Sequence, residues 1–383
     1  MIHLFINALA ASAGGGLTYV RNVLPHFAAR EDVRTTILVS GLARKEVRES
    51  GSVVVLEGPA ESRSGNRFWY EQRRLPAFVR RCGANVLISA GNFALYRSPV
   101  PQILLSRNAL YTSTDFRRDL RERGDYGLWL ETETKAVFAK WSIQKADCTV
   151  APSEAFAQEL QLWTGKDVLC IHHGFDPETF FADQIPLLPE VCAKLAATEG
   201  SLRLLFVSHY NYYRNFETLI RATALLKERL HPRKVRLILT CRLSSKANPG
   251  EYRAESAAEL VRRLRLSDEV VELGAVPYAS LHQLYRAGDL YVTPAYAETF
   301  AHPLVEAMAS GLPVIASDLP VHKEICGQAA MYFPRFSPEL LAQRVVEADH
   351  SPKLRVAMRE AGIRRARDFS WSRHVDQLLA VAR

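Results

Sequence analysis

The sequence predicts an α/β protein built from two Rossmann-like domains that face a central cleft. Short apolar runs rich in β-branched residues alternate with segments of helical periodicity along all 383 residues, which is typical of parallel sheets covered by helices. This alternation lapses between residues 177 and 201, where prolines interrupt it. Because 48% of the residues are apolar, the chain can bury a core in each of two domains, and a globally disordered chain is excluded.

The N-terminal domain is predicted over residues 1–180. Its first strand, 2–8, leads into a helix over 17–30, whose apolar residues recur at helical spacing on one face. Further strands are predicted at 35–40, 52–56, 85–89, 102–106, 148–151 and 168–171. Further helices are predicted at 67–82, 129–145 and, after a capping Ser153, up to about 163.

An interdomain connection is predicted over 181–200 and a C-terminal domain over 201–365, followed by a last helix within 366–383. Strands are expected at 202–208, 234–241, 269–272, 289–293, 313–316 and 330–332. Helices are expected at 215–229, 251–265, 278–287, 303–310, 320–326, 337–349 and about 352–367. Ligands of such sheets bind beyond the carboxyl ends of the strands, so two facing domains suit the transfer of a group between two substrates.

The charge balance is mildly basic, with 49 Lys and Arg against 41 Asp and Glu. Basic clusters lie at 63–81, where Phe68, Trp69 and Tyr70 stand among arginines, and at 353–373. These clusters are either solvated helix faces or sites that dock on an anionic membrane. No nucleic-acid-binding motif is present, so nucleic acid is not an expected partner.

The six cysteines lie far apart and form no Cys-x-x-Cys pair. This pattern predicts neither a zinc site nor a disulfide framework, and it favours a reducing cytoplasm. No apolar run is long enough for a membrane span. The first residues lack a basic region ahead of their apolar stretch, so we interpret them as a strand and not as a secretory signal.

A glycine-rich turn, Gly14-Gly15-Gly16, follows the first strand and precedes a helix. Glycines at this place let backbone amides approach a phosphate or a sugar closely. A dinucleotide fingerprint is not completed, because Tyr19 stands where its third glycine belongs and the second strand ends without an acidic residue. A tight turn without a ligand remains an alternative.

The most informative stretch carries two glutamates, Glu298 and Glu306, at a predicted helix start. Pro303 suits the first turn of that helix and Gly311 its end. Carboxylates placed here can accept hydrogen bonds from sugar or ribose hydroxyls, and helix-start amides can meet a diphosphate. The alternative is a pair of glutamates held in salt bridges.

Glu298-x7-Glu306, with Phe300 and Pro303, resembles the signature of the retaining glycosyltransferases of family 4, which have the two-domain GT-B fold. The segments 146–154, Ala-Asp-Cys-Thr-Val-Ala-Pro-Ser-Glu, and 171–180, Ile-His-His-Gly-Phe-Asp-Pro-Glu-Thr-Phe, also resemble segments of that family. The resemblance covers most of the chain and is strongest from 146 to 333. It implies that the C-terminal helix returns to the N-terminal domain.

The resemblance also implies roles for individual residues. Glu298 would contact donor-sugar hydroxyls near the reacting carbon, and Glu306 would hold the nucleotide ribose. Arg214, at the position of the family's diphosphate-binding lysine, would neutralise the leaving group. The remaining residues implied in donor binding are Gly15, Gly16, His209, Asn215, Thr299, Phe300, Ala301 and His302.

Three departures from the family pattern stand out. Ala301 replaces a usual glycine, and His209 replaces a usual phosphate-binding arginine, where a structural histidine is an equal alternative. Arg107 and Asn108 follow a strand end where the family often has a histidine, and they are weak candidates for acceptor binding. Neither is a general base at neutral pH.

The resemblance therefore implies a metal-independent, retaining transfer of a hexosyl unit from a nucleotide-diphosphate sugar, with no further cofactor. The sequence offers no assignable carboxylate nucleophile for a double displacement, and His172 and His173 are weak candidates for bases. The implied acceptor is a glycan or a lipid-linked glycan of bacterial cell-surface polysaccharide or lipopolysaccharide, reached in the cytoplasm or at the inner membrane face. A GT-B nucleotide-sugar epimerase and a non-catalytic nucleotide-sugar-binding protein are the alternatives.

Overall fold

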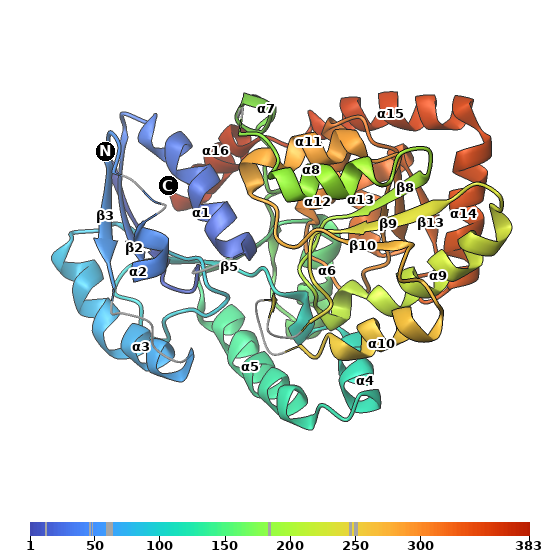
Figure 1. Cartoon of the computed structure of the whole chain (residues 1–383). Coiled ribbons are helices and arrows are strands. Elements are labelled where there is room, and N and C mark those ends of the chain that lie inside the picture. Colours follow the sequence, from blue (N-terminus) through green and yellow to red (C-terminus); the bar gives the residue numbers. More distant parts are fainter. Residues whose placement is uncertain are drawn as a thin grey trace. The chain divides into compact units, whose positions relative to one another are not determined.

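Contacts along the chain divide the protein into two compact units. Unit 1 comprises Met1–Ser113, Leu120–Gly174 and Ser370–Arg383, and unit 2 comprises Thr114–Asp119 and Phe175–Phe369. The computed structural model (Figure 1) describes residues 1–11, 14–45, 47, 49–58, 64–182, 185–244, 247–248 and 252–383.

Unit 1 is built on a parallel sheet of seven strands in the order β3-β2-β1-β4-β5-β6-β7. The strands are β1 (Ile2–Ala8), β2 (Val33–Val39), β3 (Val53–Glu57), β4 (Val86–Ser89), β5 (Gln102–Leu105), β6 (Cys148–Ala151) and β7 (Leu169–Cys170). The helices are α1 (Gly14–Ala28), α2 (Gly41–Arg44), α3 (Ser64–Arg81), α5 (Tyr126–Lys145), α6 (Glu154–Thr164) and α16 (Trp371–Ala382). A 3-10 turn covers Ala109–Tyr111.

The C-terminal helix α16 packs on α1, which confirms the predicted return to the N-terminal part of the chain. The Tyr19 hydroxyl of α1 forms a 3.0 Å hydrogen bond with Nε2 of His374, and the ring of Trp371 meets Tyr19 edge to face. Gly174 permits this approach, because a Cβ there would lie 2.0 Å from the backbone nitrogen of Trp371. His173 stacks in the same cluster, so its imidazole serves the core of unit 1.

Unit 2 is built on a parallel sheet of six strands in the order β10-β9-β8-β11-β12-β13. The strands are β8 (Leu202–Phe206), β9 (Val235–Leu239), β10 (Val270–Glu272), β11 (Leu290–Thr293), β12 (Val314–Ser317) and β13 (Ala330–Phe333). The helices that lie wholly in unit 2 are α7 (Pro177–Ala182), α8 (Pro189–Ala196), α9 (Phe216–Arg229), α10 (Glu255–Arg263), α11 (Leu281–Ala287), α12 (His302–Ala309), α13 (Pro320–Cys326), α14 (Pro338–His350) and α15 (Pro352–Ala366). The strand order reverses between β8 and β11, and this is where ligands bind in open α/β sheets.

The two parallel sheets confirm the predicted α/β class, and most predicted elements lie within a few residues of the observed ones. Helices α2 and α4 (Thr114–Glu122) were not predicted, and the segment 177–201, for which the sequence indicates one short helix, holds both α7 and α8. Helix α4 is rich in charged residues, and its two apolar residues, Phe116 and Leu120, are both buried, so its apolar signal is short. The helix predicted from 251 begins at Glu255, with 251 itself outside the described residues.

Candidate functional site

A largely buried ion pair lies beyond the carboxyl ends of β8 and β11. Glu298 stands in the loop between β11 and α12, and Arg214 ends the 3-10 turn Tyr212–Arg214 that follows β8. Nη1 of Arg214 donates to Oε2 of Glu298, and the two side chains are only 20% and 12% exposed. Two residues 84 positions apart in the sequence thus form an ion pair at the switch point of the sheet.

The ion pair fixes the charge of both partners. Burial raises the pKa of the Glu298 carboxyl, but the Arg214 guanidinium, the Thr299 amide and His322 outweigh it, so the net pKa lies below its usual value. Burial lowers the pKa of Arg214, and Glu298 together with Tyr213 reverses that shift. Glu298 is therefore an anion and Arg214 a cation at neutral pH.

Glu306 is the second glutamate of the motif and lies inside α12, 5% exposed. The Tyr285 hydroxyl donates to Oε2 of Glu306 at 2.8 Å. Burial raises the pKa of Glu306 to about 7, although the Tyr285 hydrogen bond opposes the shift. The buried Tyr291 interacts electrostatically with Arg214, Glu306 and Glu298, so one tyrosine links both ends of the motif.

The raised pKa makes the stability of the protein depend on Glu306. Because the folded protein keeps this proton at a higher pH than the unfolded chain, the free energy of unfolding falls as pH rises from 4.5 to about 7. The full effect is about 3 kcal/mol. We expect Glu306→Gln, whose amide oxygen still accepts from Tyr285, to be more stable than the wild type at pH 8 and equal to it near pH 4.5.

Urea unfolding at both pH values measures this difference. Glu347→Gln, which removes an exposed glutamate paired with Arg344, is the matched control and should follow the wild-type pH profile. If the profile of Glu306→Gln also runs parallel to that of the wild type, the raised pKa is contradicted.

Ala301 precedes α12 and has the left-handed backbone conformation, with φ +66° and ψ 63°. This conformation costs an L-residue roughly 1–2 kcal/mol. Alanine here therefore keeps the left-handed turn that a glycine would adopt without strain. The Phe300 side chain just before it is buried and meets the Phe369 ring edge to face at 5.3 Å, so core packing holds the turn.

We expect Ala301→Gly to raise the free energy of unfolding by about 0.5–1 kcal/mol. The strain energy that glycine relieves in the folded protein is larger than the free energy lost because glycine makes the unfolded chain more flexible. Ala307→Gly, in the buried middle of the same helix, is the matched control and should destabilise by about 1 kcal/mol or more. Equal destabilisation by both substitutions in thermal unfolding would show that Ala301 carries no strain.

The loop that carries Glu298 is held by hydrogen bonds to two other segments, the turn after β8 and the end of β12. Nδ2 of Asn215 donates to the carbonyl of Pro294 at 3.1 Å and to that of Arg335 at 2.7 Å. The Ser317 hydroxyl donates to the carbonyl of Ala295. The Tyr296 amide donates to the carbonyl of Tyr213 at 3.0 Å, so the Glu298 loop is tied to the turn that carries Arg214.

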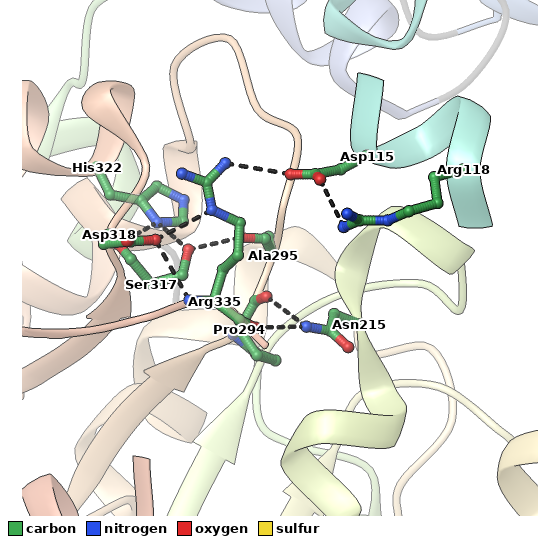
Figure 2. A network of polar contacts seen from close by, with 9 residues as sticks. All are labelled: Asp115, Arg118, Asn215, Pro294, Ala295, Ser317, Asp318, His322 and Arg335. Carbon is green, nitrogen blue, oxygen red and sulfur yellow. Dashed lines mark hydrogen bonds and ion pairs between the residues drawn. The ribbon is translucent and has the colours of Figure 1, made fainter. Parts of the chain in front are cut away.

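Helix α4 contributes a further anchor, and its residues Thr114–Asp119 group with unit 2. The Tyr296 hydroxyl donates to Oδ2 of Asp119 at 2.6 Å. Figure 2 shows Arg335 between Asp318 and Asp115, with Asp115 also bound by Arg118. These contacts fix the loop before any ligand binds, which is the preorganisation that charged sites require.

His322 closes the network behind the Glu298 loop. Its Nδ1 lies 3.0 Å from Oγ of Ser317, and burial lowers the pKa of the imidazole to about 4. His322 is therefore neutral at pH 7 and serves to orient Ser317.

His209, predicted to bind the donor, is exposed. Partial desolvation lowers the pKa of its imidazole, and the positive charge of the nearby Arg214 lowers it further.

The sequence-predicted residues of unit 2 thus fall into two groups. Arg214 and Glu298 form the ion pair and Glu306 lies in α12 bound to Tyr285, whereas Asn215 holds the surrounding loops. The Thr299 amide binds Oε1 of Glu298 at 3.0 Å. The ring of His302, the first residue of α12, lies 4.9 Å from that of Phe300.

The predicted residues of unit 1 have contacts within that unit. Gly15 has open space around it, whereas a Cβ at Gly16 would lie 3.1 Å from Cα of Ala11. Arg107 stacks 4.4 Å over the ring of Tyr19 and donates to the carbonyl of Ala90. Asn108 caps the 3-10 turn after it by accepting from the Leu110 amide at 3.0 Å.

Sequence reasoning missed the tyrosines of the site. The sequence pattern predicts Tyr285 and Tyr291 to be core residues of a helix and a strand. In the structure their ring centroids lie 5.9 Å apart. Tyr213 lies under the Arg214 guanidinium at 5.1 Å. A buried tyrosine hydroxyl needs a polar partner, and this requirement was the one signal in the sequence that could have pointed to them.

Two family profiles match the chain. One, described as Glycosyltransferase Family 4, matches residues 13–179, and the other, described as Glycosyl transferases group 1, matches residues 190–365. Together they span most of both units and include the Glu298 and Glu306 motif in the second match.

The curated relatives include two enzymes named D-inositol 3-phosphate glycosyltransferase. The protein from Corynebacterium aurimucosum is 26% identical over 65% of this chain and 59% of its own length. That from Kineococcus radiotolerans is 29% identical over 63% of this chain and 58% of its own length. The match thus spans about six tenths of the length of these relatives.

Solved structures share the fold over the whole chain. Sucrose-phosphate synthase from Thermosynechococcus elongatus superposes with a TM-score of 0.79 at 17% identity, over 100% of this chain and 98% of that one. The HepE protein of Anabaena, solved with UDP-glucose, gives a TM-score of 0.72 at 17% identity, over 100% and 99%. At these identities the likeness concerns the fold.

Proposed function

The chain belongs to the family 4 glycosyltransferases, and on that premise we propose that it transfers a hexosyl unit from a nucleotide-diphosphate sugar to a glycan or lipid-linked acceptor. The observation that carries the proposal is the largely buried Arg214–Glu298 pair at the switch point of the unit 2 sheet, with Tyr291 interacting electrostatically with this pair and with Glu306. A fixed cation and two carboxylates at this edge suit a substrate that combines a diphosphate with hydroxyl-rich sugars.

We assign the proposed roles by charge. Arg214 neutralises the charge that builds up on the leaving nucleoside diphosphate, and Glu298 accepts hydrogen bonds from sugar hydroxyls. Glu306 accepts from the ribose hydroxyls. The pKa of Glu306, about 7 in the free protein, makes ribose binding tighter as pH rises, because the ionised carboxylate is the better acceptor.

The proposed chemistry is a front-face substitution with retention. The bond from the anomeric carbon to the diphosphate oxygen breaks while the bond to the acceptor oxygen forms on the same face. The acceptor proton passes to the leaving phosphate oxygen, so neither a protein base nor a metal ion is required. A trapped glycosyl-enzyme adduct would refute this step in favour of double displacement.

We propose that residues 201–365 bind the donor and residues 1–180 the acceptor, joined by 181–200, with 366–383 completing the N-terminal domain. Gly15, with open space around it, suits the approach of a diphosphate, and Arg107 and Asn108 remain proposed acceptor contacts. The proposed setting is cell-surface polysaccharide or lipopolysaccharide synthesis at the inner face of a bacterial membrane. Among the described residues, no helix combines the length and the apolarity needed to cross a bilayer.

Thermal shifts test the donor site first. UDP, GDP, ADP, dTDP and CMP, with their sugars, should be screened in EDTA, because a ligand of the folded state raises its stability. UDP-glucose leads the panel, since HepE was solved with it. We expect a shift with one nucleoside diphosphate that Glu306→Ala reduces and the surface control Glu347→Ala preserves. No shift with any of them contradicts the donor site.

The acceptor is then sought with the donor that binds. Inositol 3-phosphate is the first candidate, because the curated relatives are named for it, and lipid-linked glycans are the second. The anomeric configuration of the product, read by NMR, tests retention. Inversion would contradict the proposed mechanism while leaving the donor site intact.

A further inference from the structure

Helix α3 presents a cationic outer surface. It carries five arginines, Arg67, Arg73, Arg74, Arg80 and Arg81, and one carboxylate, Glu71. Glu71 is buried, accepts from Nδ2 of Asn7 at 3.1 Å and interacts electrostatically with the half-buried Arg67, which leaves the four exposed arginines of the helix without offset from it. Arg63, at the start of this basic cluster, lies outside the described residues.

Helix α5 presents an apolar stripe. Tyr126, Leu130, Val137 and Trp141 are each 49–63% exposed and follow one another at intervals of four, seven and four residues. This spacing places them on one side of a helix. The opposite side is buried through Thr132, Ala136, Ala139, Ser142 and Ile143. The stripe was not predicted from the sequence, because the net hydrophobic periodicity of α5 is weak when both sides are apolar.

Helices α3 and α5 are labelled in Figure 1, and both belong to unit 1. A chain of aromatic rings joins them. The exposed Trp69 of α3 meets Phe68 at 5.9 Å, and Phe68 meets Phe138 of α5 at 5.3 Å. Phe138 in turn meets Trp141 at 5.9 Å, and the Arg73 guanidinium lies 5.2 Å from the Trp69 ring. We call the exposed arginines and apolar side chains of the two helices the α3–α5 face; its members are Trp69, Arg73, Arg74, Arg80, Arg81, Tyr126, Leu130, Val137 and Trp141.

We propose that the α3–α5 face docks on an anionic lipid bilayer. Exposed tryptophans flanked by arginines match the membrane interface, where the rings enter the headgroup region and the cations meet lipid phosphates. A second copy of the chain fits less well, because two copies joined through α3 would oppose arginine to arginine. The assignment deepens the proposed membrane location and is independent of the transfer reaction.

Vesicle cosedimentation of the full chain tests the cationic part. We expect binding to vesicles of phosphatidylcholine with phosphatidylglycerol, weakening with added salt, and little binding to phosphatidylcholine alone. Arg73→Glu/Arg80→Glu should lower the partition coefficient about 10-fold or more. Arg229→Glu/Arg263→Glu, which makes the same charge change at exposed positions of α9 and α10, outside both basic clusters, is the matched control and should bind as the wild type. Equal loss in both variants, or no binding at low salt, overturns the proposal.

The aromatic part needs a separate variant. Trp69→Ala/Trp141→Ala should weaken vesicle binding several-fold, and wild-type fluorescence should be quenched by brominated lipid. Leu162→Ala, at an exposed leucine of α6, is the control. If Trp69→Ala/Trp141→Ala binds vesicles as the wild type does, the aromatic contribution is overturned. If the wild type does not bind vesicles but forms a dimer that the double variant dissociates, the partner of this face is a second copy of the chain and the lipid proposal is overturned. Donor-induced thermal shifts should persist in every docking variant, which separates failure of this surface from failure of the donor site.

Discussion

Glu298→Gln is expected to lower turnover at least about 100-fold, because it removes a preorganised charge from the reacting centre. The substitution keeps the volume of the side chain and can still accept from the Thr299 amide. It leaves the buried Arg214 without its counterion, however, so the protein should also lose stability. Initial rates with the donor found by thermal shift, measured well below the melting temperature of the variant, give the effect on turnover alone.

Glu269→Gln is the matched control for this experiment. Glu269 is also a largely buried glutamate of unit 2, paired with Lys227 at 3.0 Å. Its loss should affect stability and leave turnover near the wild-type value. The proposed role of Glu298 fails if Glu298→Gln turns over like Glu269→Gln once both are folded.

Arg214→Ala is expected to reduce turnover about 10-fold or more and to weaken nucleoside diphosphate binding. The loss follows from removing the cation that faces the proposed leaving group. Arg214→Lys should recover only part of the rate, because an ammonium cannot reproduce the planar fork of a guanidinium. Steady-state rates and diphosphate affinity measured together separate the two effects.

The same substitution should reverse the pH dependence that Glu298 gives to stability. In the wild type the pKa of Glu298 is lowered, so the pair stabilises the fold above the usual carboxyl pKa and this contribution is lost as pH falls. Without Arg214, burial dominates and raises the pKa, so Arg214→Ala should lose stability as pH rises. The difference in the free energy of unfolding between Arg214→Ala and the wild type, measured with urea across pH 4 to 8, shows the sign, because the Glu306 contribution is common to both proteins.

Arg233→Ala provides the comparison for Arg214→Ala. Arg233 pairs with the buried Asp349 elsewhere in unit 2. Its removal should destabilise the protein without a comparable effect on nucleotide affinity. If both arginine variants bind the diphosphate as the wild type does, Arg214 is a structural residue and the donor site lies elsewhere.

The local order of elements follows from residues close together in the sequence. Period-two and helical patterns, with Ser153 as a cap and Pro303 at a helix start, predict the strands and helices because these signals act within a few residues. Helix α4 was not predicted, because most of its side chains are charged and only two are apolar. Glu298 and Glu306 are also placed by nearby residues, because the start of α12 lies between them and Pro303 marks it. Glu298 therefore stands in the loop and Glu306 within the helix.

The sequence by itself therefore determined the α/β class, the positions of most elements and the two glutamates of the candidate site. Only the tertiary structure decided that Arg214 pairs with Glu298, that Asn215 and Asp119 hold the Glu298 loop, and that Tyr285 meets Glu306. The physical reason is that these contacts join residues 21 to 177 positions apart. Such contacts depend on strand order and on burial, which local periodicity does not encode, and burial also sets the pKa values on which the chemistry depends.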